Sequence, residues 1–352
     1  MKIAPAQRLN AEAAQTVRGG EYMDGGILGN QKIPAVPDDG ILDNYFFMGC
    51  NPAGPVQEFL RAMSFTAAQA DVFDLPEQKK AALISLLSDE DPAVFKAIRE
   101  EIMSHGPGVR DWLSPYALDA DPLLRRRTQE IVIHYDRMDA DTVFSAFCLN
   151  HGDDLDLEEG CWLLSETVYP EINTGAYRAI LDDFAHDLMM QLDFGAEPEG
   201  LVAGINQYLF RVHKFGGNED NYYDPDNTFL NRVIDRRTGN PISLCMIYLS
   251  VCRRLGLPVT GIGLPGHFLC RFQNPRQELY IDAFNRGRVL SKTDCMKYLK
   301  QAGYEFHESF LLPASPRRIL LRMCSNLHQV YQRNGMKEDA TRLQGYIVAL
   351  SK

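Results

Sequence analysis

The 352-residue sequence contains no long hydrophobic run, because none of its apolar stretches approaches the roughly 18 to 20 residues that cross a bilayer. Its first residues lack the basic and then apolar layout of a secretory signal. Its eight cysteines form no C-x-x-C pair and have no zinc-site spacing with histidines. No P-loop signature for nucleotide phosphates is present. We therefore expect a cytoplasmic protein with reduced thiols, no membrane association, no metal and no cofactor.

Positive charge is scarce relative to negative charge. The chain has 36 Lys and Arg against 47 Asp and Glu, a net charge of −11, whereas nucleic-acid binding needs a concentrated positive surface. The excess is confined to residues 151–200, which hold 13 acidic residues and one basic residue, Arg178, so the rest of the chain is nearly neutral. This acidic segment is either a solvated helix surface or a docking face for a basic protein.

The first two regions of the chain differ in pattern. Residues 1–58 are rich in Gly, Pro, Asn and Asp without a sustained period, which predicts a flexible leader. Residues 59–195 have helical spacing of apolar residues and contain two similar helix starts, Asp91-Pro92 and Asp121-Pro122. In each, the Asp can cap a helix whose first turn holds the Pro. Two such units of about thirty residues predict a helical region resembling HEAT repeats.

After a linker at 196–200 the pattern becomes mixed. Residues 201–305 predict an α+β core, in which a helix over 242–255 is followed by three strands, over 259–264, 267–272 and 278–284. Residues 306–352 predict two helices joined at Asn334-Gly335, a helical hairpin the size of one tetratricopeptide repeat. The expected fold class for the whole chain is therefore α+β, with helical regions on both sides of the core.

Three side chains of the core could meet as a nucleophilic site. Cys245 lies near the start of the predicted helix, His267 begins one strand, and Asp282 lies on the next strand. A cysteine nucleophile needs a lowered pKa, which a helix amino terminus and an imidazole provide, and a carboxylate then orients the imidazole. The order suits a papain-like arrangement, although the spacing alone is common in proteins of this size.

A longer motif narrows the choice of family. Residues 216–272, GGNEDNYYDPDNTFLNRVIDRRTGNPISLCMIYLSVCRRLGLPVTGIGLPGHFLCRF, and residues 280–291, YIDAFNRGRVLS, resemble the signature of the SirB-one family of transglutaminase-like proteins. Similar segments occur in some animal F-box proteins. The resemblance runs from about residue 60 to the carboxyl terminus and includes a tetratricopeptide-like tail. It implies a transglutaminase-like, papain-like core in which active relatives use Cys at a helix start with His and Asp on adjacent strands.

The resemblance assigns two of these three positions and departs at the third. The His of the family motif is His267 and the Asp is Asp282. Active relatives place the Cys about fifteen residues before the Gly that ends the helix, and fifteen residues before Gly256 stands Pro241, which has no nucleophile. Cys245 follows four residues later, one helical turn or about 5.4 Å further along. It is either a displaced nucleophile or a buried thiol.

Further residues are candidates for lining a cleft around these three. Ser243 either attacks with His267 as base or bonds the helix start through its hydroxyl. Asp282 and Asn285 either face a site or belong to a turn. The loop at 218–225 either closes a cleft or is a plain turn. The candidate lining residues are Asn218, Asp220, Tyr222, Asn240, Pro241, Ser243 and Asn285.

Three functions follow from these observations. The first is a non-catalytic transglutaminase-like protein that acts as a regulatory or protein-interaction module, because Pro241 stands where a thiol is expected. The second is an acyl-transfer enzyme, of the thiol protease, amidase or transglutaminase type, using Cys245 or Ser243 with His267 and Asp282. The third is a helical adaptor whose acidic face binds a basic protein. We expect a protein partner and exclude nucleic acid and membrane.

Overall fold

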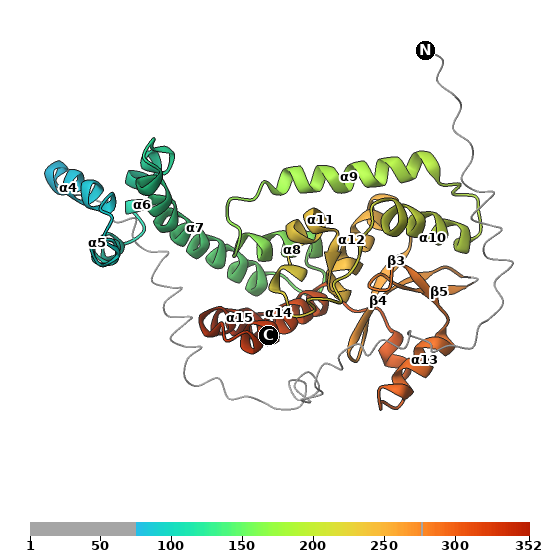
Figure 1. The fold of residues 1–352 in the computed structure, drawn as a ribbon. Helices are drawn as coiled ribbons and strands as arrows, with labels where there is room; N and C mark the ends of the chain where they lie inside the picture. The colour runs from blue at the N-terminus through green and yellow to red at the C-terminus, as the bar shows by residue number, and fades with distance from the viewer. Residues whose placement is uncertain (1–74, 276) are drawn as a thin grey trace, which may run out of the picture. The chain divides into compact units, whose positions relative to one another are not determined.

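The computed structural model describes residues 75–275 and 277–352 (Figure 1). The predicted leader, 1–58, and the first residues of the predicted helical region lie outside the described residues. The described chain forms two compact units. Residues 75–148 and 163–172 form the first, here called the helical unit, and residues 149–162 and 173–352 form the second, here called the sheet unit.

The helical unit contains α4 (Glu77–Leu87), α5 (Pro92–Ser104), α6 (Val109–Leu113), the 3-10 turn η1 (Ser114–Leu118) and most of α7 (Pro122–Asn150). The two helix starts predicted from Asp-Pro pairs are confirmed. The Asp91 side chain accepts a hydrogen bond from the Ala93 amide, and the Asp121 side chain accepts one from the Leu123 amide. The core of the unit is apolar and includes the fully buried Leu87 and Ile102.

Helices make up most of the sheet unit. They are α8 (Leu157–Glu166, shared with the helical unit), α9 (Thr174–Gln191), α10 (Pro198–Asn206), the π-helix η2 (Gln207–Val212), the 3-10 turn η3 (Pro225–Asn227), α11 (Leu230–Arg236), α12 (Pro241–Arg254), α13 (Lys292–Gln301), the 3-10 turn η4 (Glu308–Leu311), α14 (Pro316–Arg333) and α15 (Lys337–Leu350). The sequence predicted that the helical region ends at the 196–200 linker. In the structure α9, which precedes this linker, belongs to the sheet unit and packs on α12.

An antiparallel sheet of four strands lies in this unit, in the order β3 (Val259–Leu264), β4 (His267–Gln273), β5 (Glu278–Asp282) and β6 (Arg288–Leu290). The three predicted strands are confirmed, as is the α+β class, with helices predominating. The sequence did not predict β6 or the two-residue parallel pair of β1 (Gly216–Gly217) with β2 (Thr238–Gly239). Such short strands are too brief for an alternating pattern to mark them.

Helices cover both faces of the sheet (Figure 1). On one face Cys270 of β4 points to α12, where its thiol lies 3.7 Å from the Cys245 carbonyl oxygen. On the other face Leu269 packs in an apolar cluster with Leu299 of α13 and Leu311 of η4. Successive strand residues point to opposite faces, so the sheet separates α12 from α13.

The last two helices, α14 and α15, pack along each other, and α14 lies against β3. Gly261 and Gly263 leave the room that this approach needs. A Cβ atom at Gly261 would lie 3.0 Å from the Ile319 side chain, and one at Gly263 would lie 2.9 Å from the Arg322 guanidinium. Across the described part of the chain, no helix combines the length and the apolar character needed to span a membrane.

Candidate functional site

The amino terminus of α12 is closed by hydrogen bonds. Asn240 caps the helix by accepting from the Ser243 amide at 2.9 Å, while the Asn240 amide donates to the Ser243 hydroxyl at 3.1 Å. The Ser243 hydroxyl itself donates to the carbonyl oxygen of Asn227 at 2.6 Å, and the side chain is fully buried. Of the two roles considered for Ser243, the structure therefore shows the bond at the helix start.

The other two candidate positions of the helix, Pro241 and Cys245, are buried as well. Pro241 occupies the first position of α12, which suits its missing N–H, and it is buried. Cys245 is also fully buried, one turn further along, and its thiol donates to the Phe268 carbonyl oxygen at 3.6 Å. The neighbouring Cys270 thiol has its pKa raised far above the ordinary value by burial. Cys245 is therefore a buried thiol whose hydrogen bond goes to the backbone of β4.

His267 and Asp282 form a buried pair at the start of β4 and the end of β5. Nε2 of His267 lies 3.0 Å from Oδ1 of Asp282, and their side chains are only 2% and 0% exposed. The contact is at ion-pair distance without the alignment of a straight hydrogen bond. Strand pairing holds both residues in place, because His267 pairs with Leu264 and Asp282 with Arg288.

Asn285 satisfies the remaining oxygen of Asp282. Its side-chain amide donates to Oδ2 at 2.7 Å, and its backbone amide donates to Oδ1 at 3.2 Å. Burial alone would raise the pKa of Asp282, but the adjacent His267 and the hydrogen bonds from Asn285 hold this pKa below its ordinary value. Asp282 is therefore charged at neutral pH. Asn285 belongs both to the turn and to the site, which combines the two predicted roles.

Aromatic side chains surround the His267 ring. Its centroid lies 6.4 Å from that of Phe284 and 6.0 Å from that of Tyr298 of α13, and Tyr222 lies 6.0 Å from Phe284. The Tyr298 hydroxyl donates to the carbonyl oxygen of Pro265 at 3.2 Å. Burial raises the pKa of Tyr298 to about 12 and also raises that of Tyr222, so both hydroxyls are neutral hydrogen-bonding groups at physiological pH.

Arg322 of α14, which no sequence motif predicted, joins this group. Its Nη2 donates to the carbonyl oxygens of Leu264 at 2.6 Å and of His267 at 2.9 Å. Arg322 stands among apolar and basic residues of an amphipathic helix, 55 residues after His267. The glycine pair in β3 that admits its side chain is the one sequence feature that could have indicated it.

The loop at 218–225 is held together by its own hydrogen bonds. Asn218 donates from its side chain to Oδ1 of Asn227 at 2.9 Å and accepts from the Asn221 amide. Nδ2 of Asn227 in turn donates to the Asn221 and Tyr222 carbonyl oxygens. Asp220 is exposed to solvent. Of the loop candidates, Tyr222 therefore lies nearest to the site, while Asn218 holds the loop together.

Two other kinds of site are not supported by the structure. Residues 261–266 have the spacing G-x-G-x-x-G, but a tight turn and then strand β4 follow β3, so there is no helix amino terminus to hold a phosphate. Within the described residues, no group of three or more His, Cys, Asp and Glu side chains is arranged to hold a metal ion.

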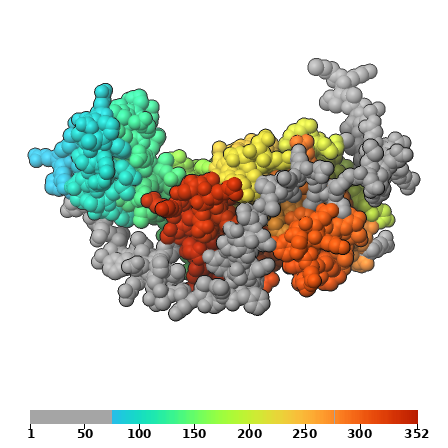
Figure 2. All heavy atoms as spheres, turned by 60° about the horizontal axis from the view of Figure 1, so that its bottom comes forward, coloured from blue at the N-terminus to red at the C-terminus, as the bar shows by residue number. Residues whose placement is uncertain are grey.

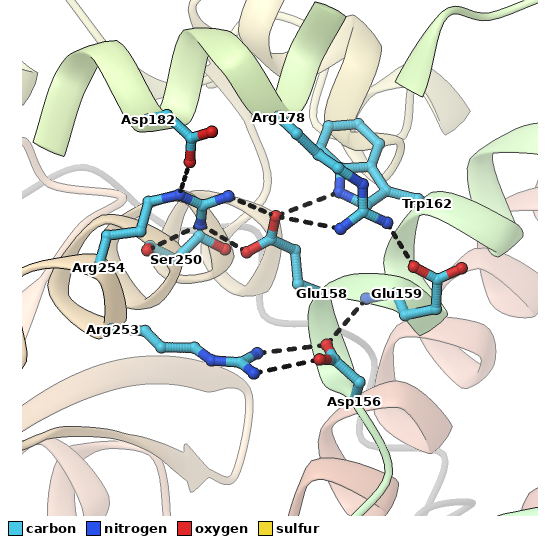
Figure 3. A network of polar contacts seen from close by, with 9 residues as sticks. All are labelled: Asp156, Glu158, Glu159, Trp162, Arg178, Asp182, Ser250, Arg253 and Arg254. Carbon is cyan, nitrogen blue, oxygen red and sulfur yellow. Dashed lines mark hydrogen bonds and ion pairs between the residues drawn. The ribbon is translucent and has the colours of Figure 1, made fainter. Parts of the chain in front are cut away.

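Arginines at the carboxyl end of α12 neutralise part of the acidic segment (Figure 3). Arg254 donates to the two carboxylate oxygens of Glu158 at 2.6 and 2.9 Å, and to Asp182 at 2.5 Å. Nη2 of Arg253 lies 3.1 Å from Oδ2 of Asp156. The Glu158 side chain is 7% exposed, so this part of the segment is interior rather than surface.

Arg178, the basic residue within the segment, completes the network (Figure 3). It contacts Glu159, lies 3.6 Å from Glu158, and stands over the ring of Trp162. The network joins α8, α9 and α12 and uses four acids of the segment. A docking face for a basic protein therefore has less free negative charge than the sequence suggested.

Comparisons with known proteins agree with this core. A model of the transglutaminase-like superfamily matches residues 175–325. The UPF0162 protein of Xylella fastidiosa is 35% identical to the chain over 194 residues, which cover 53% of this chain and 69% of that protein. The UPF0162 protein of Pseudomonas aeruginosa is 30% identical over 183 residues, which cover 51% and 65% of the two chains.

A third relative is a longer protein. F-box only protein 21 of Homo sapiens is 30% identical over 160 residues, which cover 43% of this chain and 24% of that protein. No solved structure matches the chain significantly. The superfamily match over residues 175–325 includes α12, the four-stranded sheet and Arg322, so the similarity extends over the site described above.

Proposed function

Because the chain belongs to the UPF0162 family and carries a transglutaminase-like superfamily domain, we propose that it is a non-catalytic protein-interaction module. One observation carries the proposal. The first position of α12, where the resemblance expects a thiol, holds buried Pro241 in a fully capped helix start. A covalent acyl-transfer mechanism needs a nucleophile within hydrogen-bond reach of its base.

The two other candidate nucleophiles are engaged elsewhere. The Ser243 hydroxyl is fixed by Asn227 and Asn240, and the Cys245 thiol donates to the Phe268 backbone in an apolar interior. The His267 and Asp282 pair is nevertheless held in place, and aromatic side chains border it. A structured polar group without a nucleophile suits recognition better than acyl transfer.

The relatives agree with a module that works within larger assemblies. The similar segment forms about a quarter of F-box only protein 21, so it occurs as one part of a longer chain. The resemblance of the motif to the SirB-one family, of the tail to a tetratricopeptide repeat and of residues 59–195 to HEAT repeats stays a prediction. Helical repeats commonly bind proteins, which fits the same role.

Catalysis is tested by turnover of acyl substrates. We expect wild-type protein, His267→Gln and Cys245→Ala to hydrolyse p-nitrophenyl acetate equally slowly, and none to join a fluorescent amine to a glutamine peptide. Pro241→Cys provides the matched gain-of-function variant. Its new thiol at a helix start should react with iodoacetamide faster than any wild-type thiol, and His267→Gln in that background should slow the reaction. Wild-type turnover that both single variants abolish would overturn the proposal.

Partner binding is tested by photo-crosslinking in the native cell. Asp220→p-benzoylphenylalanine places the crosslinker on the exposed loop next to Tyr222, and the matched control places it at Met190, which is 75% exposed on α9. We expect the loop position, but not the control, to yield one reproducible protein adduct. A crosslinking pattern that is the same at both positions would contradict a binding role for this site.

A further inference from the structure

Arg322 brings a positive charge into the site without a negative partner. Its guanidinium lies at the turn between β3 and β4, and its Nη2 donors are used by the backbone of Leu264 and His267. Its Nε is buried and has no hydrogen-bond partner among the residues that the structure describes. In the same part of the chain no Asp or Glu side chain forms an ion pair with Arg322.

Such an arrangement is costly unless something compensates it. A buried guanidinium loses its hydration, and buried charges in proteins are usually paired. The burial is deep enough to lower the pKa of Arg322. Asp282 is the acid nearest to the His267 ring, but its oxygens are already used by His267 and Asn285. The neutral carbonyl groups at the turn supply only part of the compensation.

The groups around Arg322 are hydrogen-bond donors of the kind that hold an anion. Tyr298 lies 6.0 Å from the His267 ring and Tyr222 lies 6.0 Å from Phe284, so both belong to the group that Arg322 joins through the His267 carbonyl oxygen. The ring of Phe268 lies 5.7 Å from the guanidinium carbon and forms one wall. Arg322, Tyr222 and Tyr298 are each partly exposed as whole residues, although the Nε atom of Arg322 is itself buried, so the group lies just below the surface.

We propose that Arg322, together with the hydroxyl of Tyr222, binds a carboxylate group of a protein partner beside the His267 and Asp282 pair. The carboxylate comes from an acidic side chain or from a chain terminus, and both present the same two oxygens. A planar guanidinium is suited to them, and charge-assisted hydrogen bonds are the stronger kind. This deepens the proposed binding function and rests on it, because it assigns the chemistry that the module recognises.

Peptide titrations followed by NMR test the proposal on the full chain. The probes are Ac-Ala-Ala-Glu-NH₂ for a side-chain carboxylate, Ac-Ala-Ala-Gly-OH for a terminal one, and Ac-Ala-Ala-Gln-NH₂ as the neutral match. With labelled arginine, we expect one or both carboxylate peptides to shift the Nε–H signal of Arg322, and the neutral peptide to bind at least about 10-fold more weakly. The carboxylate peptide that binds more tightly shows whether the recognised carboxylate is a side chain or a chain terminus.

Variants separate recognition from folding. Arg322→Gln should abolish the preference for carboxylate over the neutral peptide. Because it also removes the contacts to the β3–β4 turn, Tyr222→Phe serves as the milder variant and should weaken carboxylate binding several-fold. Tyr223→Phe is the matched control and should leave binding unchanged, because it keeps the ring that packs on Tyr222 and lies against Arg333 and removes only a hydroxyl outside the proposed contact.

The possible failures are distinguishable. Equal binding of the neutral and carboxylate peptides, or unchanged binding in Tyr222→Phe and Arg322→Gln, would overturn carboxylate recognition but leave a non-catalytic binding role in place. Hydrolysis of the probes would instead overturn the non-catalytic role. No shift of the Arg322 signal with any peptide would also overturn carboxylate recognition at this residue.

Discussion

Among single residues, Asp282 shows most directly how the site is held together. It is a fully buried carboxylate whose charge is compensated by one imidazole and two amide groups. Burial opposes ionisation, so the lowered pKa of Asp282 reflects how well His267 and Asn285 offset the lost hydration. Removing this charge, or one of its partners, should therefore affect the stability of the whole sheet unit.

We predict that Asp282→Asn lowers the free energy of unfolding by about 3 kcal/mol at pH 7, as for a broken buried pair. The folded pKa lies below the ordinary value of 3.8, so the contribution is fully present above that value. It is lost as the pH falls through the folded pKa. Urea unfolding of wild-type and variant protein between pH 7 and pH 3 measures this change. A difference in unfolding free energy that does not change with pH would contradict this role of the Asp282 charge. The control is Asp220→Asn, which removes the same charge at an exposed position.

The sequence predicted those residues of the site whose position follows from a local pattern or motif. His267 and Asp282 could be placed on adjacent strands from alternating patterns and a motif, and the structure brings them to 3.0 Å. Arg322 could not be placed, because its contact depends on how α14 packs against β3 and no local pattern records that packing. The hydrogen bond that the Ser243 hydroxyl donates likewise depends on tertiary packing, because its acceptor, the Asn227 carbonyl oxygen, lies sixteen residues earlier.

At the scale of elements, α12 is the centre of the sheet unit. Its amino end carries the closed helix start, its middle packs on β4, and its carboxyl end carries the two arginines of the ion-pair network. The arginines differ in environment. Arg254 and Glu158 have side chains 19% and 7% exposed, whereas Arg253 is 65% exposed.

We predict that Arg254→Met lowers the free energy of unfolding by about 3 kcal/mol, because it leaves the buried charge of Glu158 without its main partner. Arg253→Met, the matched neighbour, should cost less than about 1 kcal/mol, since exposed ion pairs contribute little. Urea unfolding at pH 7 measures both. Equal losses for the two variants would show that the network stabilises the unit through its total charge and not through burial.

Element boundaries were predictable to the extent that they depend on local chemistry. The Asp-Pro helix starts and the three longer strands follow from capping and alternation. The π-helical turns of η2 follow α10 directly, and a change of hydrogen-bond register leaves no apolar pattern in the sequence that could identify them. Strand β6 was missed for a similar reason, because three residues show no periodicity.

For the whole molecule, the main feature is that each compact unit has its own core. The apolar cluster of the helical unit includes Leu87, and that of the sheet unit includes Leu269; both are fully buried. The two tryptophans of the chain report on one unit each, because Trp112 packs against the first cluster and Trp162 lies in the sheet unit.

We predict that Leu87→Ala destabilises the helical unit by about 2 to 5 kcal/mol and leaves the sheet unit almost unchanged. Labelling with 5-fluorotryptophan gives one fluorine signal for each unit, so one urea titration followed by NMR reports both transitions. Leu269→Ala is the matched variant and should have the opposite pattern. A common shift of both signals in either variant would show that the units unfold together.

The contact between α14 and the β3–β4 turn also has a consequence for the time at which the site forms during protein synthesis. Arg322 follows His267 by 55 residues, so at about 5 to 20 residues per second a ribosome adds it roughly 3 to 11 s later. Until then the Leu264 and His267 carbonyl groups lack their arginine donor. The site is therefore completed after its His and Asp are already in the chain, so the proposed carboxylate recognition would have to wait until α14 has been made.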